Sequence, residues 1–206
     1  MPTPREQFAA ALQLHADDFG VELASEHIVK LEDYHSLLLK WNARLHLTAP
    51  CSPEQFATRH VLESLILAKH LPINARVADI GSGAGLPIIP CLIVRGDLHA
   101  TLIEASQKKS VFLNEALRLA QAADRTTVLN ARFEDTPTPN VDFVTCRALD
   151  KFSALLPAMI EWTPADATLM LFVGDLLRNR VEATLRAIQV KQIPLSDSRF
   201  LVVGRR

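Results

Sequence analysis

Three glycines at alternate positions follow an acidic residue near the middle of the chain. The stretch reads Val77-Ala78-Asp79-Ile80-Gly81-Ser82-Gly83-Ala84-Gly85-Leu86-Pro87. Its short apolar run is typical of a buried strand. Glycine lets the backbone turn sharply and leaves no Cβ between the loop and a ligand, and proline is tolerated in the first turn of a helix. The stretch therefore predicts a strand, a ligand-binding loop and a helix start, as at the binding edge of an α/β sheet.

The spacing of the three glycines selects among nucleoside ligands. A dinucleotide-binding loop has its third glycine three residues after the second, and Leu86 stands at that position, so a dehydrogenase is disfavoured. The pattern G-x-G-x-G resembles instead the S-adenosylmethionine loop of class I methyltransferases. Glu104 ends a second apolar run about 20 residues further on, where an acid can accept hydrogen bonds from ribose hydroxyls. A tight turn without a ligand is the alternative.

Other residues near the predicted strand ends could take part in the same site. Asp79 is expected to orient the loop or to meet an amino group through water; the alternative is a hydrogen bond that only closes the loop. Arg147 follows a predicted strand and can pair with a carboxylate or a phosphate, or form an ion pair with Glu134 or Asp150. Cys146 is interpreted as a small buried residue rather than as a nucleophile for pyrimidine methylation.

Residues 1–72 are predicted to be helical, and residues 73–206 to form the ligand-binding sheet domain, with both parts in one packed unit. The expected helices run over about 5–20, from Ser25 through Trp41, and from an N-cap at Ser52 to a stop before Pro72. Trp41 continues an apolar helical stripe, so it is predicted to lie in the core rather than to stack on a base.

The rest of the chain alternates between strand-like and helix-like segments. The predicted segments are strands at 98–103, 126–129, 141–146, 167–173, 190–193 and 199–203, and helices at 107–121, 152–160 and 175–188. The short turn Ser196-Asp197-Ser198 requires an antiparallel pair. The fold class is therefore predicted as α/β, Rossmann-like, with about seven mostly parallel strands, the last antiparallel, plus an N-terminal helical extension.

Composition is that of an ordinary globular protein. The chain has 206 residues, 49% of them apolar and 22% charged, with a net charge of −1, so RNA binding would need a local basic patch. No apolar run is long enough to predict a membrane span. Cys51, Cys91 and Cys146 lie far apart without metal-ligand spacing, so no metal site is expected. Because no disulfide framework is visible either, we expect a cytoplasmic location.

Four segments together resemble one family, the bacterial small-subunit ribosomal RNA methyltransferase G family, also called glucose-inhibited division protein B. Trp41–Ala49 resembles the family motif W-N-x-x-x-N-L-T, and Arg59–Ser64 resembles R-H-x-x-D-S. Asp79–Pro87 resembles D-x-G-S-G-A-G-x-P. The fourth match is in two pieces, Ala131–Glu134 and Cys146–Ala148, which resemble R-x-E and S-R-A. The match covers about residues 30–175. The chain departs from the family at His46, Glu63, Ile88 and Val173, and the change at Val173 removes a charge near the expected substrate side.

The resemblance implies a site and a reaction. S-adenosylmethionine would lie against Gly81, Gly83, Gly85 and Leu86, with Phe133 and Glu134 flanking the adenine. Arg147, Arg59 and His60 are candidate substrate contacts, although a structural role is favoured for the last two. The implied reaction is methylation of guanine N7 in 16S ribosomal RNA.

Guanine N7 already carries a free lone pair, so no general base is required and no catalytic acid or base is assigned. Catalysis can depend on proximity and alignment. The alternatives are a methyltransferase of the same fold with another substrate, and a binding module without activity. The partner would be 16S ribosomal RNA or the small ribosomal subunit, and a monomer is favoured.

Overall fold

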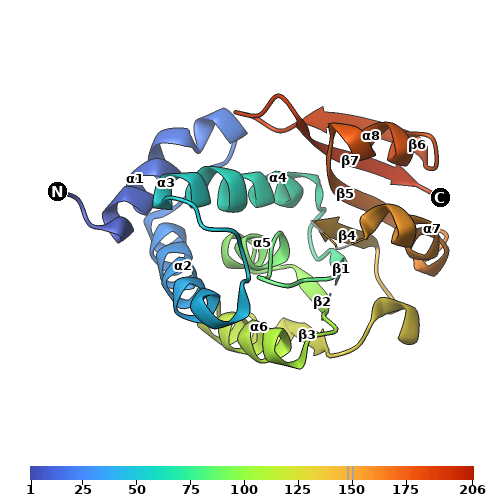
Figure 1. Ribbon diagram of the computed structural model, residues 1–206, viewed down its shortest axis with the longest axis horizontal. Helices are drawn as coiled ribbons and strands as arrows, with labels where there is room; N and C mark the ends of the chain where they lie inside the picture. The colour runs from blue at the N-terminus through green and yellow to red at the C-terminus, as the bar shows by residue number, and fades with distance from the viewer. Residues whose placement is uncertain (148, 150) are drawn as a thin grey trace.

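A seven-stranded sheet forms the centre of the molecule, and a computed structural model describes residues 1–147, 149 and 151–206 of the chain (Figure 1). Ala148, in one of the family-like motifs, and Asp150, a predicted partner of Arg147, lie outside the described residues. The strands are β1 (Arg76–Ile80), β2 (His99–Ile103), β3 (Thr126–Leu129), β4 (Phe143–Arg147), β5 (Thr168–Gly174), β6 (Arg186–Gln192) and β7 (Arg199–Arg205).

The strand order in the sheet is β3-β2-β1-β4-β5-β7-β6. Strands β1 to β5 pair in parallel, and β7 is antiparallel to both of its neighbours. The predicted number of strands and the antiparallel last strand are therefore confirmed. Because β7 runs against β5, its first residue, Arg199, pairs with Gly174, the last residue of β5. Arg199 thus lies at the edge where the parallel strands end.

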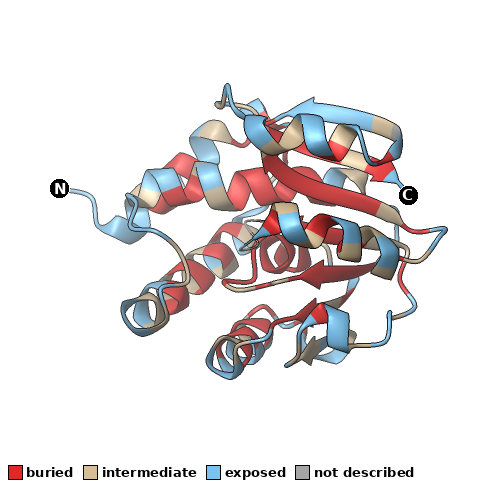
Figure 2. Ribbon diagram, turned by 45° about the vertical axis from the view of Figure 1, so that its right-hand side comes forward, coloured by how far each residue is buried: buried red, intermediate tan, exposed pale blue. Residues whose placement is uncertain are grey.

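Helices cover both faces of the sheet. The helices are α1 (Pro4–His15), α2 (Ser25–Leu45), α3 (Pro53–Phe56), α4 (Glu63–His70), α5 (Ile88–Val94), α6 (Gln107–Leu119), α7 (Phe152–Trp162) and α8 (Asp175–Glu182). Helices α1 to α6 form one side, where α2 contacts α5 and α6, and α7 and α8 lie on the other (Figures 1 and 2). One continuous apolar cluster includes residues both before and after residue 72, for example Leu38 and Phe112.

Local signals in the sequence explain some of the helix ends. Ser52 caps α3 through its side chain and forms a capping box with Gln55, as expected for Ser-Pro-Glu. Ser25 is not a cap as predicted; it is the first residue of α2, and Ala24 precedes the helix without a side-chain bond. The helix predicted over 175–188 is also wrong beyond Glu182, because Arg186–Gln192 forms β6 by pairing with β7.

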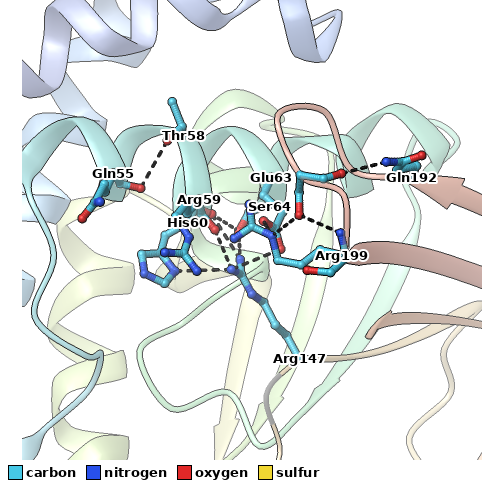
Figure 3. A network of polar contacts seen from close by, with 11 residues as sticks. Gln55, Thr58, Arg59, His60, Glu63, Ser64, Arg147, Gln192 and Arg199 are labelled. Carbon is cyan, nitrogen blue, oxygen red and sulfur yellow. Dashed lines mark hydrogen bonds and ion pairs between the residues drawn. The ribbon is translucent and has the colours of Figure 1, made fainter. Parts of the chain in front are cut away.

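Between α3 and α4 the helix widens into a π-helical segment, η2 (Ala57–Leu62). The sequence indicated a continuous helix here, because its apolar residues keep an ordinary helical spacing. A π-helical turn shifts the backbone hydrogen bonds by one residue, and such turns are frequent at functional sites. This segment faces the end of β4 and carries Arg59 and His60 (Figure 3).

Candidate functional site

The glycine loop between β1 and α5 is held in a conformation that side chains disfavour. Gly81 and Gly85 have φ angles of 69° and 81°, in the left-handed region where a Cβ is costly. A Cβ at Gly85 would also overlap the Ile89 side chain, and one at Gly81 would overlap the side chain of Leu149. The backbone N–H groups of Gly81 and Ser82 both donate to the Ile103 carbonyl, at 2.9 and 3.1 Å. The loop is therefore fixed to the end of β2.

Two side chains from other elements brace this loop. Glu104, just after β2, accepts from the Gly83 N–H at 2.9 Å through one oxygen and from the Ser106 N–H at 2.7 Å through the other. Tyr34, from α2, is fully buried and donates its hydroxyl to the Ala84 carbonyl at 2.7 Å. Each Glu104 oxygen keeps a second lone pair, so the carboxylate can still accept from a ligand hydroxyl.

Asp79 lies behind the loop and is 1% exposed. Neither of its carboxylate oxygens has a hydrogen-bond partner among the described residues. Burial raises the pKa of Asp79 to about 8, and the nearby charge of Glu104 adds to the rise. Buried polar groups are normally satisfied. An unpartnered acid beside a ligand loop therefore fits a cationic or hydrogen-bond-donating group of a ligand.

Two hollows lie along the loop and share Gly81. The first, of about 370 Å³, is lined by the segment after β3, including Phe133 and Glu134. Phe133 is buried, and its ring meets Trp162 edge-on, with the ring centroids 5.9 Å apart. The second, of about 270 Å³, runs over Gly81–Ala84 and Leu86 to Arg147. The two hollows together form an elongated site whose floor is the glycine loop.

Arg147 extends from the end of β4 to the π-helical segment (Figure 3). Its guanidinium donates to the main-chain carbonyls of Arg59 and His60, at 2.6 and 3.4 Å, and to the Ser64 hydroxyl at 3.3 Å. It also forms an ion pair with Glu63 at 3.3 Å. The side chain is 11% exposed. Arg147 therefore links the helical part to the sheet, and Glu63 takes the place proposed for Glu134 as its acidic partner.

Glu63 is the acid at the centre of this cluster. Its side chain is 3% exposed, and its oxygens lie 3.3 Å from a nitrogen of Arg147 and 3.3 Å from the Nε of Arg199. The second contact is an ion pair without hydrogen-bond geometry. Burial raises the pKa of Glu63, and the guanidiniums of Arg147 and Arg199 oppose that rise. One buried carboxylate thus faces two guanidiniums.

His60 completes the cluster as a neutral side chain. Burial lowers its pKa to about 3, and the charge of Arg147 lowers it further. The His60 Nδ1 lies 3.3 Å from an Arg147 nitrogen. Arginine can only donate hydrogen bonds, so Nδ1 is the acceptor and the ring proton is on Nε2. His60 is therefore arranged to support Arg147 rather than to carry a positive charge.

A third hollow, of about 380 Å³, opens beside this cluster. Its lining combines an apolar floor with a basic wall and includes Phe152, Phe172, Leu177, Val173, Gly174, Arg59, Glu63 and Arg199. It shares Ala49, His60 and Arg147 with the hollow over the glycine loop. The arrangement therefore places a long site along the loop next to a separate basic hollow, as a two-substrate transfer requires. We call this third hollow the acceptor hollow.

The residues singled out from the sequence gather at this edge of the sheet. Those that line a hollow are Gly81, Gly83, Leu86, Phe133, Glu134, Arg147, Arg59 and His60. Asp79, Gly85 and Glu104 shape or brace the loop from behind. Sequence reasoning did not assign a role to Tyr34, Glu63 or Arg199. Tyr34 sits at helical spacing with buried leucines and resembles core, and nothing near Arg199 in the sequence distinguishes it from other surface arginines.

Cys146 is fully buried, and burial raises the pKa of its thiol. Both facts favour the apolar interpretation over the nucleophile. In the part of the chain that the structure describes, no cluster of three or more His, Cys, Asp or Glu residues could hold a metal ion. None of the described helices combines the length and the apolar character that a membrane span needs.

Comparison with known proteins gives a consistent result. A relative from Xanthomonas campestris, named ribosomal RNA small subunit methyltransferase G, is 38% identical over 207 residues, covering 97% of this chain and 95% of the relative. One of the same name from Halorhodospira halophila is 31% identical and covers 89% and 88%. The structure of M. jannaschii TYW2 in complex with AdoMet has a TM-score of 0.56 at 17% identity, covering 71% of this chain and 76% of that one.

The last comparison supports the fold alone, because the identity is low. The family model described as GidB, rRNA small subunit methyltransferase G, matches residues 27–206. That range includes the glycine loop, the π-helical segment and the arginine cluster. With its Rossmann-like methyltransferase fold, this chain belongs to the rRNA small subunit methyltransferase G family.

Proposed function

We propose that this protein transfers a methyl group from S-adenosylmethionine to N7 of a guanine in 16S ribosomal RNA. The observation that carries the proposal is the adjacency of the three hollows, which share lining residues from the glycine loop to the arginine cluster, in a member of this family. Such adjacency suits a nucleoside cofactor whose reactive end meets a second substrate. The same reasoning favours a cytoplasmic protein, because its substrate would be ribosomal.

The residues present fit S-adenosylmethionine. Phe133 and Glu134 would flank the adenine, and Glu104, with a free lone pair on each oxygen, would accept from the ribose hydroxyls. The methionine end would lie over Gly81 and Gly83, where no Cβ intervenes. The unpartnered carboxyl group of Asp79 lies behind the loop and lines none of the three hollows, so it would meet the α-ammonium group through water. Arg147 contributes through the shape and charge of the wall, because its donors already bind Glu63 and the helix.

For the proposed methyl transfer, the main task of the protein is to align the two substrates. When bound, S-adenosylmethionine supplies an electrophilic methyl group on a sulfonium. Guanine N7 can accept this methyl without losing a proton, since its lone pair is free. The acceptor hollow would orient the base on its apolar floor and exclude water, which is worth several kcal/mol in comparable reactions. His60 and Arg147, which line both hollows, would form the wall between the two substrates.

The test uses methyl-labelled S-adenosylmethionine with either naked 16S ribosomal RNA or isolated small subunits. We expect label in RNA, recovered as 7-methylguanosine after digestion. Label in a protein or a small molecule would support the alternative of the same fold with another substrate. Tight cofactor binding without any labelled product would support a binding module. Calorimetry with S-adenosylmethionine alone separates a failure of cofactor binding from a wrong acceptor.

A further inference from the structure

Arg199 reaches the acceptor hollow from an unexpected direction. It is the first residue of β7, and the reversed direction of that strand brings it to the edge where β5 ends. Its register partner, Gly174, has no side chain, and Val173 and Gly174 both line the hollow. The space above this pair is therefore open to the long side chain of Arg199.

The near end of the Arg199 guanidinium is held, while its far end faces the hollow. Its Nε donates to the Ser196 hydroxyl at 3.1 Å and lies 3.3 Å from a carboxylate oxygen of Glu63. Among the described residues, no hydrogen bond involves its two terminal nitrogens. The side chain is 24% exposed. Glu63 and Ser196 thus hold the Nε of Arg199, whose two terminal nitrogens can still donate hydrogen bonds to a ligand. Figure 3 shows Arg199 beside Glu63 and Arg147.

The charges around the hollow leave room for an anion. Three guanidiniums, from Arg59, Arg147 and Arg199, line it, and Glu63 is the one acid among its described lining residues. The terminal nitrogens of arginine match the geometry of phosphate oxygens. A base resting on the apolar floor would carry its phosphates toward the open, basic rim. Glu63 alone does not balance the positive charge of the three guanidiniums, and an RNA phosphate would balance the remainder.

We propose that Arg199 binds a backbone phosphate of the acceptor RNA, and that Glu63 is the residue that positions it. This inference depends on the proposed function, since it requires an RNA acceptor. It assigns Arg199 to binding rather than to the transfer step. Removing it should therefore raise the KM for RNA about tenfold, leave kcat within about twofold, and leave the affinity for S-adenosylmethionine unchanged.

The test measures RNA affinity at a series of salt concentrations, with whichever of 16S ribosomal RNA and small subunits the wild type methylates. Each phosphate contact contributes about 0.7–0.9 to the slope of log K against log salt. We expect Arg199→Gln to reduce the slope by about that amount and Arg199→Lys to retain it with weaker binding. Arg205→Gln, an exposed arginine at the far end of the same strand, is the matched control.

Thermal unfolding and S-adenosylmethionine affinity establish that Arg199→Gln is folded. If it is not folded, Arg199→Lys replaces it: RNA binding weaker than that of the wild type at an unchanged slope supports the proposal, and RNA binding as tight as that of the wild type would overturn it. A slope that falls no more in Arg199→Gln than in Arg205→Gln would overturn the phosphate contact, as would a loss of base preference at constant slope. Wild-type protein that binds S-adenosylmethionine but methylates no ribosomal RNA would overturn the proposed function, and this inference with it.

Discussion

The glycine loop and the acceptor hollow are neighbours built on different principles. The loop is made by the backbone: positive φ angles, N–H groups and the absence of Cβ atoms over a few consecutive residues. The acceptor hollow is made by side chains from α3, η2, α4, β4, α7, β5, α8 and β7, joined through Glu63 and Arg147. The backbone conformation of the loop should withstand substitutions around it but not an added Cβ within it. The acceptor hollow should instead be sensitive to any change in the balance of its charged side chains.

The strongest way to break the loop is Gly85→Ala. The added Cβ would overlap Ile89 at a φ of 81°, and the left-handed conformation alone costs about 1–2 kcal/mol. We expect S-adenosylmethionine affinity to fall by more than about tenfold, measured by calorimetry. Gly96→Ala is the control, because nothing lies within 4 Å of its added Cβ. Equal affinities in the two variants would contradict a loop built on glycine geometry.

Charge balance in the acceptor half is tested by Glu63→Ala. Removing one partner of a buried ion pair leaves the other charge uncompensated and costs about 3–5 kcal/mol. We expect a loss of this size in the free energy of unfolding, measured with urea. The double variant Glu63→Ala, Arg147→Ala should lose less than the sum of the single losses.

The half-buried ion pair of Arg178 with Glu182 provides the control for that experiment, because it lies nearer to solvent than Glu63. Glu182→Ala should change the free energy of unfolding by no more than about 0.5 kcal/mol. If Glu63→Ala and Glu182→Ala prove equally mild, the acceptor half does not depend on its buried carboxylate. The contrast drawn with the loop would then fail.

Acid should weaken the helical packing beside the π-helical segment. His35 stacks between Phe8 and Phe56, with ring centroids 4.6 and 4.5 Å away, and burial lowers its pKa to about 4. The unfolded chain binds this proton from about pH 6.5, so stability declines as pH falls from 6.5 toward 4. His35→Phe should make the decline shallower by up to about 1.4 kcal/mol per pH unit.

Urea unfolding at several pH values checks this expectation. The exposed His99 on β2 gives the control substitution, His99→Gln. The same slope in His35→Phe and the wild type would contradict a buried neutral histidine beneath the π-helical segment.

The smallest expected effect concerns a side chain that supports the glycine loop. Tyr34 is a hydrogen-bonded connection from α2 to the glycine loop, and Tyr34→Phe removes one bond worth about 0.5–1.5 kcal/mol. We expect the dissociation constant for S-adenosylmethionine to rise about two- to tenfold. Trp41→Phe removes a bond of similar length to Glu115, away from the loop, and should weaken folding only. Unchanged cofactor affinity in Tyr34→Phe would mean that the loop holds its shape unaided.

The same contrast explains which features could be predicted from the sequence. Gly81, Gly83 and Gly85 predict the loop, because its geometry depends on a few consecutive residues. The apolar runs predict the strands in the same way. The acceptor hollow has no such local signal, because Glu63 and Arg199 lie far apart in the chain and meet only through the strand order. The end of α8 was missed for a related reason: Arg186–Gln192 forms a strand because β7 is available as a partner.

The strand order also has a consequence for how the protein is made. β7 is the last strand of the chain, yet it lies between β5 and β6. On a translating ribosome, β6 has no neighbour with which to pair until β7 has emerged. Arg199 arrives with the same segment. The basic rim of the acceptor hollow therefore cannot form before β7 has been made and has paired with β5.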